Sequence, residues 1–237
     1  FETVEAEMMQ APAAAAPKKI DKKGVSEYFL YTIEGTETIP HQWSKRLPSF
    51  RAGAVPVVNR YHYEEERFGN AVVRFLRIEN DRKSGLGQTP VPAGDLQVFR
   101  SLGDDRRLAF VGRSRFKYIP VGKEADLNLG PVENVRVEPV LMRQASDHYR
   151  FFKDGNISGW DEVLSYRVRV KNRRPVPAAV EIVRNFASPN WEIELAGDYG
   201  KYTRVDADSV KFLLHTALRS ETEFTYTLTI HHGKRAE

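Results

Sequence analysis

The sequence predicts an all-β protein in which two antiparallel, immunoglobulin-like β-sandwich units follow one another after an extended N-terminal tail. Along many short segments, apolar and polar residues alternate, as in strands that bury one face and expose the other. Clusters of glycine, proline and asparagine separate these segments at short intervals. Many short strands with such turn signals are typical of sandwiches and barrels rather than of βαβ units.

Residues 1–24 form the predicted tail, because their composition differs from that of the rest of the chain. Residues 11–17 are all alanine or proline, which prevents a long helix and favours an extended, semi-rigid spacer. We therefore expect a linker that follows a further domain. Four apolar residues ahead of the spacer make this segment a candidate for self-association. They are Phe1, Val4, Met8 and Met9.

After the tail, the first predicted sandwich unit spans residues 25–130 and the second spans residues 131–237. The boundary is placed at Leu129-Gly130-Pro131, where glycine and proline are typical of a hinge. In the first unit, residues 72–78 form a nearly continuous apolar run, which is the pattern of a central strand.

In the second unit, the alternation is strict in three segments, residues 166–171, 191–195 and 224–230. The pattern in the last of these predicts that Tyr226 points into the core and that Thr227 points to solvent. One short helix is expected, over Ser209–Arg219.

The composition argues against several classes of function. The 237 residues carry a net charge of +4, and the 36 Lys and Arg are interspersed with the 32 Asp and Glu. A nucleic-acid-binding protein normally gathers its basic residues on one element, so we expect no such partner. Apolar runs fall short of the ~18–20 residues of a membrane span, which predicts no transmembrane segment. The absence of cysteine excludes disulfides and thiolate metal sites.

Residues Asp154–Gly159 resemble the first half of a calcium-binding loop. Oxygen-bearing side chains occupy alternate positions and are followed by a glycine, as calcium loops require. The position that should supply the closing bidentate glutamate is Ser165 instead. The favoured interpretation is therefore an Asx-type turn in a hairpin, with a calcium site as the alternative.

Other polar residues do not form a recognisable catalytic or metal-binding pattern. His231 and His232 are neighbours on a predicted strand, so they point to opposite faces and cannot easily share a metal ion. The acidic pairs Asp104-Asp105 and Asp206/Asp208 lie in turn-like contexts, where solvated carboxylates are common. We expect no metal, no cofactor and no catalytic residues, and the chain is not predicted to be an enzyme.

Aromatic residues supply the candidate interaction surface. Trp191 alternates with apolar residues and is expected in the core, whereas Trp43 and Trp160 lie among polar residues. Tyr61 and Tyr63 form a second candidate patch just before an acidic run. Such rings either stack on sugars and anchor partners, or pack half-buried at a sandwich rim.

The order of strands and turns resembles a family of bacterial domains of unknown function, the C-terminal half of mucoidy-inhibitor-like proteins. The matching segments are Tyr31–Ile33, Thr38–Pro40, Val57–Asn59, Pro92–Gly94, Val98-Phe99, Val111-Gly112, Ile119–Glu124, Leu127–Gly130, Val168–Asn172, Pro175–Pro177 and the strand of Tyr226. The resemblance implies an all-β module behind an N-terminal domain and a linker. It also implies a location in the bacterial cell envelope, periplasmic or extracellular, and it implies no catalytic residues.

Two hypotheses of function follow. The first is a non-catalytic structural or protein-interaction module of the bacterial cell envelope or exterior, which binds a protein partner or a second copy of itself. The second is a carbohydrate-binding or carbohydrate-processing domain with polysaccharide as its ligand. The second requires that Trp43 and Trp160 share a concave face with carboxylates.

Overall fold

The computed structural model describes residues 20–25, 28–36, 38–46, 51–87, 89–103, 107–196 and 201–237. Strands account for 62% of the chain and helix for 3%, which confirms the predicted all-β class. The chain divides into two compact units, Phe1–Gly53 and Ala54–Glu237, which we describe separately.

The N-terminal unit contains one antiparallel hairpin. Its strands are β1 (Ile20–Val25) and β2 (Tyr28–Ile33), paired from Ile20↔Ile33 to Val25↔Tyr28. The predicted tail of residues 1–24 is therefore too long at its C-terminal end, because residues 20–24 already belong to a strand. The candidate association residues Phe1, Val4, Met8 and Met9 lie outside the described residues, so that expectation stays a prediction.

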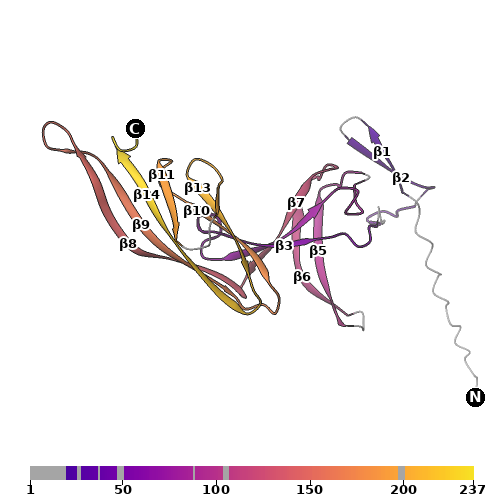
Figure 1. Ribbon diagram of the computed structural model, residues 1–237. Helices are drawn as coiled ribbons and strands as arrows, with labels where there is room; N and C mark the ends of the chain where they lie inside the picture. Colours follow the sequence, from indigo (N-terminus) through magenta and orange to yellow (C-terminus); the bar gives the residue numbers. More distant parts are fainter. Residues whose placement is uncertain are drawn as a thin grey trace, which may run out of the picture. The chain divides into compact units, whose positions relative to one another are not determined.

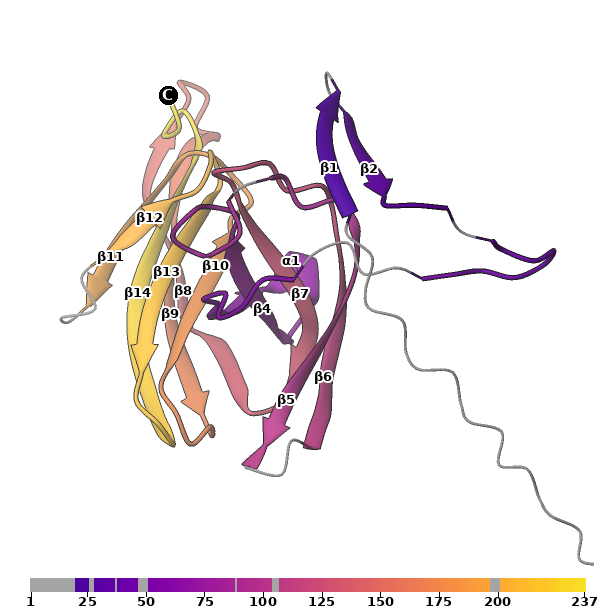
Figure 2. The ribbon, with the colours of Figure 1, turned by 90° about the vertical axis from the view of Figure 1, so that its right-hand side faces the viewer.

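The larger unit is built around a β-sandwich, whose two layers are visible in Figures 1 and 2. One layer is a six-stranded sheet with the order β12-β13-β10-β3-β4-β7. Its strands are β3 (Val58–Glu64), β4 (Val72–Glu79), β7 (Glu124–Val132), β10 (Ala178–Asn185), β12 (Tyr202–Arg204) and β13 (Ser209–Thr216).

The other layer is a four-stranded antiparallel sheet with the order β11-β14-β9-β8. Its strands are β8 (Val135–Phe151), β9 (Ile157–Asn172), β11 (Trp191–Ala196) and β14 (Ser220–Gly233). A two-stranded ribbon, β5 (Gly94–Leu102) and β6 (Arg107–Phe116), lies beside β7, with Gly112 of β6 close to Leu129.

The sheets do not follow the predicted division at residues 130/131. The six-stranded sheet combines β3, β4 and β7 from the first half of the chain with β10, β12 and β13 from the second. The join is a parallel pairing of β3 with β10, in which Tyr61 lies opposite Val180. The predicted hinge at Gly130-Pro131 lies within β7. The two halves therefore build one sandwich together, instead of two sandwiches in tandem.

The core lies between the two layers and draws on both. Every second residue of β14 from Phe224 to Ile230 is buried, and so are Val168 and Val170 of β9. The opposite layer contributes Phe212 of β13, whose ring lies 5.4 Å from that of Tyr226. Trp191 is also buried, which confirms its predicted place in the core.

The expected helix over Ser209–Arg219 is wrong, because Ser209–Thr216 forms β13 and a turn follows it. Val210, Phe212 and Leu214 are buried in the core, while Leu213 between them is half exposed. The buried residues therefore follow the period of a strand. Within the described residues, the α-helix is the four-residue α1 (Glu65–Phe68) between β3 and β4.

Candidate functional site

The outer edge of the four-stranded sheet is formed by β8, a strand of 17 residues. Beyond Pro139 its side chains are almost all exposed, and many of them are large and apolar. The exposed apolar residues along β8 are Val140, Leu141, Met142, Tyr149 and Phe151, of which Phe151 is 62% exposed. Exposed apolar side chains on an edge strand, whose outward backbone groups lack a neighbouring strand, favour the addition of another strand.

The pairing of β8 with β9 is regular only in part. It runs without interruption from Arg143↔Ser165 to Asp147↔Asp161 and is irregular on both sides of this stretch. The irregularities place one extra residue in β8 at Met142 and one more before Arg150, where His148 and Tyr149 together lie opposite Trp160. His148 adopts a left-handed backbone with a φ of 50°. The edge is therefore bent at two points, with a regular segment of five residues, 143–147, between them.

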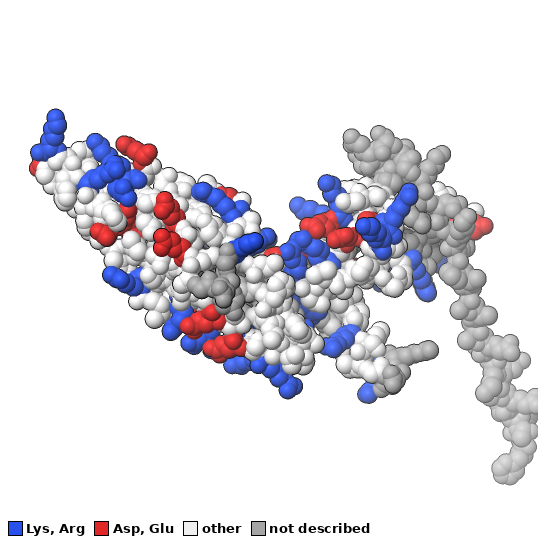
Figure 3. Space-filling view, viewed as in Figure 1, with Lys and Arg blue, Asp and Glu red and all other residues white. Residues whose placement is uncertain are grey.

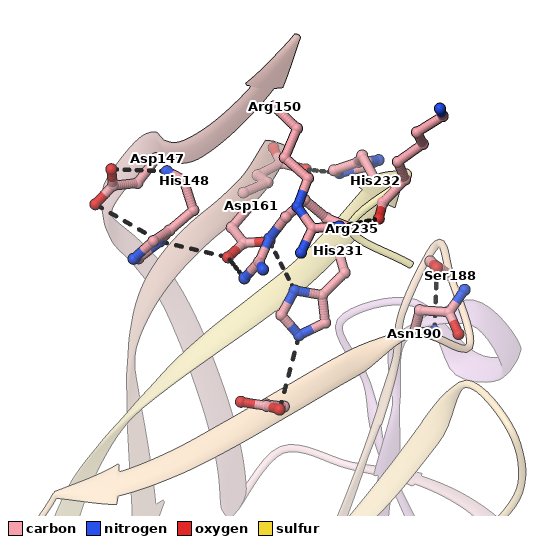
Figure 4. Close-up of polar contacts among 12 residues, drawn as sticks. Asp147, His148, Arg150, Asp161, Ser188, Asn190, His231, His232 and Arg235 are labelled. Carbon is pink, nitrogen blue, oxygen red and sulfur yellow. Dashed lines mark hydrogen bonds and ion pairs between the residues drawn. The ribbon is translucent and has the colours of Figure 1, made fainter. Parts of the chain in front are cut away.

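An ionic cluster holds the distal part of β8 and the end of the chain against β9, as Figure 4 shows. Its centre is Asp161 of β9, whose side chain is almost fully buried. Arg235 donates two hydrogen bonds to the carboxylate, at 2.9 and 2.6 Å. His231 Nδ1 lies 2.7 Å from Asp161 Oδ1, and His148 Nδ1 lies 3.4 Å from Asp161 Oδ2. We call these four residues the Asp161 clasp.

The clasp fixes the ionisation of its central carboxylate. The Arg235 guanidinium, assisted by His231, lowers the pKa of Asp161 to about 2 even though burial acts in the opposite direction. Asp161 therefore carries its charge throughout the physiological range. Because all of its oxygen contacts are with basic side chains, it serves to join β8, β9 and the C-terminal turn.

A close approach of two glycines allows the C-terminal turn to reach the clasp. Gly159 of β9 lies opposite Gly233 of β14, and the Lys234 amide donates a 2.9 Å hydrogen bond to the Ser158 carbonyl. A Cβ atom on Gly233 would lie 2.3 Å from the Ser158 carbonyl oxygen, and the φ of Gly233 is +56°. Glycine at this position is required on both grounds.

We expect Gly233→Ala to destabilise the larger unit more than Gly155→Ala does. Both glycines have a positive φ, so both substitutions carry the left-handed penalty of about 1–2 kcal/mol. A Cβ on Gly155 meets nothing within 4 Å, whereas at Gly233 the steric overlap adds roughly 1–3 kcal/mol. Urea unfolding measures the free energy of unfolding of both variants. If both lost the same amount of this free energy, the close approach of Gly233 to the Ser158 carbonyl would be contradicted.

A second polar site lies in a hollow of about 570 Å³ on the outer face of the six-stranded sheet. Glu181 of β10 is buried there between Arg60, with which it forms an ion pair, and His62, whose Nδ1 lies 3.6 Å from Glu181 Oε2. His62 Nε2 lies 3.0 Å from Glu64 Oε2. The hollow thus contains a chain of alternating acidic and basic groups.

The two central groups of the hollow favour each other's charged forms. The contact with His62, followed by the charge of Arg60, lowers the pKa of Glu181 against the effect of burial. Burial alone would lower the pKa of His62, but the contacts with Glu181 and Glu64 outweigh it and the pKa is raised. These contacts tie β3 to β10 across their parallel pairing.

The predicted aromatic surface is only partly exposed. Trp43 is 74% exposed, in a turn where its amide donates a 3.1 Å hydrogen bond to the Pro40 carbonyl. Trp160 is half-buried, and its ring stacks on His232 with the centroids 4.8 Å apart. Tyr61 and Tyr63 are buried in the core, so their assignment to an interaction surface is wrong. They alternate with the polar residues of β3 and occupy its inward face.

The predicted turns are confirmed where the structure describes them. In the loop between β8 and β9, the Asn156 amide donates a 3.1 Å hydrogen bond to Asp154 Oδ1, which makes an Asx turn. Asp206 likewise accepts a 3.2 Å hydrogen bond from the Asp208 amide. Asp104 and Asp105 lie outside the described residues.

The described residues contain no group of three or more His, Asp or Glu side chains arranged to hold a metal ion. In the same part of the chain, no helix is long and apolar enough to cross a membrane. Lys and Arg alternate with Asp and Glu over the visible face of the sandwich, as Figure 3 shows. This mixed pattern agrees with the interspersed charges of the sequence.

Comparison with protein-family models, curated proteins and solved structures gives no match for this chain. The resemblance to the C-terminal domain of mucoidy-inhibitor-like proteins therefore stays a prediction.

Proposed function

We propose that this chain is a non-catalytic protein-interaction module that binds a partner polypeptide along the outer edge of β8. The observation that supports this most directly is the presence of two groups of exposed apolar side chains on an edge strand, Val140–Met142 and Tyr149 with Phe151. Proteins normally protect such an edge with charged residues, prolines or short strands, because it otherwise recruits other strands. A long edge that exposes apolar groups on both sides of a polar segment is best explained by a partner that covers it.

Two other edge strands of the sandwich, β11 and β12, differ from β8 in this respect. At the opposite end of the four-stranded sheet, β11 has six residues and exposes the glutamates Glu192 and Glu194. At one end of the six-stranded sheet, β12 has only three residues. Shortness and charge are the usual means of protecting an edge. The contrast supports β8 as the edge that is kept open for binding.

The Asp161 clasp supports the same proposal, because it makes the edge rigid. Strand addition costs less conformational entropy when the receiving strand is already ordered. The clasp ties His148 of β8 to β9, and the Arg150 guanidinium donates a 3.0 Å hydrogen bond to the Lys234 carbonyl. Both contacts lie within the exposed part of β8, so the distal part of this edge is fixed against β9 and the C-terminal turn before any partner arrives.

The bacterial cell envelope, periplasmic or extracellular, belongs to this proposal through the resemblance alone. Carbohydrate binding has less support. Tyr61 and Tyr63 are buried, and the ring of Trp160 is already stacked on His232. A sugar-binding platform needs exposed rings.

The test is photo-crosslinking from the β8 edge in the cells that produce the protein. A photoreactive phenylalanine replaces Phe151, and the matched control carries it at the exposed Glu221 of β14. We expect one adduct of defined mass from position 151, linked through an extended segment of the partner. Adding Leu141→Lys to the same chain should abolish it, because the new charge lies at the edge.

Equal labelling from positions 151 and 221, or an adduct that survives Leu141→Lys, would contradict a binding site on β8. The far-UV circular dichroism spectrum of each variant shows that the sandwich is retained. This control is feasible because all three side chains are exposed.

A further inference from the structure

We propose that the partner at β8 is a second copy of this chain, paired antiparallel with β8 about a two-fold axis at Ala145. This inference rests on the proposed function and identifies the partner at the same edge. The product would be a continuous eight-stranded sheet made of two four-stranded sheets. A two-fold contact of this kind uses the same surface on both copies and closes on itself.

The regular segment of β8 is complementary to itself. Its sequence is Arg143-Gln144-Ala145-Ser146-Asp147. When two copies run antiparallel about Ala145, Arg143 of each lies opposite Asp147 of the other. Gln144, whose side-chain amide donates a 2.7 Å hydrogen bond to Glu162 of its own chain, then lies opposite Ser146, and the two small Ala145 side chains meet at the axis. Opposite charges directly across two strands stabilise their pairing.

The charges required for this contact are available. Arg143 is exposed and, among the described residues, forms no ion pair within its own chain. The side chain of Asp147 is 69% exposed, and its contacts are with the amide and ring of the neighbouring His148. Neither side chain has to break a strong interaction in order to pair with the second copy.

The register about Ala145 is favoured over its neighbours. An axis at Arg143 would place the two copies of that arginine opposite each other, and an axis at Asp147 would do the same with two carboxylates. An axis at Gln144 or Ser146 would leave both charges opposite uncharged residues of the segment or its flanks. Because like charges directly across two strands are destabilising, the sequence specifies one register.

The flanking residues fit the same register. Leu141 of one copy comes near Tyr149 of the other, so the exposed apolar groups on both sides of the segment cover each other. Pro139 cannot donate a backbone hydrogen bond and would end the ladder at that side. The contact therefore has a charged centre, apolar flanks and a defined end.

The test is a charge-reversal series on the purified full chain, followed by sedimentation velocity over a range of concentrations. We expect the wild type to form dimers. Arg143→Asp alone and Asp147→Arg alone should each place two like-charged pairs across the axis and weaken the dimer roughly tenfold or more. The double variant Arg143→Asp/Asp147→Arg restores opposite charges and should recover dimers. The control Arg136→Asp changes an exposed arginine of β8 outside the segment and should leave the dimer intact.

A wild type that stays monomeric at every concentration, or a double variant as weak as either single variant, would overturn the pairing about Ala145. The proposed function fails separately, in the crosslinking experiment. A single adduct with a different polypeptide from position 151, with a monomeric purified chain, leaves β8 as the binding edge and rejects only the second copy as its partner.

Discussion

Tyr226→Asp is expected to unfold the larger unit, whereas Thr227→Asp at the next position should be tolerated. The Tyr226 side chain is 1% exposed, and its ring packs against Tyr166 at 5.2 Å and Phe212 at 5.4 Å. Its hydroxyl accepts a 3.2 Å hydrogen bond from Arg184 Nε, and burial raises the pKa of Tyr226 to about 12. An aspartate there would lose the ring contacts between the two layers and bury a carboxylate.

Such a change costs several kcal/mol, on the order of the whole stability of a domain. Thr227 lies on the outward face of the same strand, opposite Ser165 and Glu194. The cost of Thr227→Asp, including repulsion from Glu194, should be about 1 kcal/mol or less. Urea unfolding, followed by tryptophan fluorescence, measures the free energy of unfolding of both variants. Equal losses would mean that the faces of β14 are assigned incorrectly.

The second large effect is expected from Asp161→Asn, which removes the charge of the clasp and keeps the shape of the side chain. Arg235 and the two histidines would lose their common partner, and the loss should be about 2 kcal/mol, which is the free energy that corresponds to the lowered pKa of Asp161. The control Asp154→Asn changes an exposed carboxylate of the neighbouring turn and should cost less than about 0.5 kcal/mol. Hydrogen exchange should also show faster exchange in the distal part of β8.

The difference in stability between the wild type and Asp161→Asn should depend on pH. The pKa of Asp161 lies at about 2 in the folded state, below its ordinary value, so the charged form favours folding. This contribution is fully present above about pH 4 and is lost as the pH falls from 4 to 2. The stability difference between wild type and Asp161→Asn should therefore shrink over that window. If the stability difference between the two proteins stayed constant down to pH 2, the lowered pKa of Asp161 would be contradicted.

The strands and their faces could be predicted from the sequence because they depend on local burial. Each alternating segment in the second half became a strand, and Tyr226 and Trp191 point inward as expected. The same rule would have placed Tyr61 and Tyr63 correctly, since they alternate with Arg60, His62 and Glu64 along β3. Their position before an acidic run suggested a surface patch instead.

The pairing of the strands could not be predicted, because it is set by contacts between distant residues. Alternation does not state which strand lies beside which, so the parallel neighbours β3 and β10 were assigned to different units. The error at Ser209–Thr216 has a local cause. Leu213 and Leu218 are apolar but half exposed, and together with the buried Val210 and Leu214 they imitate the spacing of a helix.

The Asp161 clasp and the open edge of β8 are even harder to predict from the sequence than the strand pairing. The clasp unites Asp161 with His148 and Arg235, which are separated along the sequence and meet only through the register of β8, β9 and β14. The apolar run Val140-Leu141-Met142 breaks the alternation of β8, and that break marks the point where the strand leaves the core. Edge position follows from the order of the whole sheet and has no local pattern.

The parallel pairing of β3 with β10 also determines the order in which the protein can fold during synthesis. Arg60 of β3 forms an ion pair with Glu181, 121 residues later in the chain. At the usual rate of translation, this interval corresponds to roughly 6–24 s. Throughout that time β3 can pair with β4, but the side that later receives β10 remains open. During synthesis, therefore, one side of β3 lacks its partner strand until β10 has emerged.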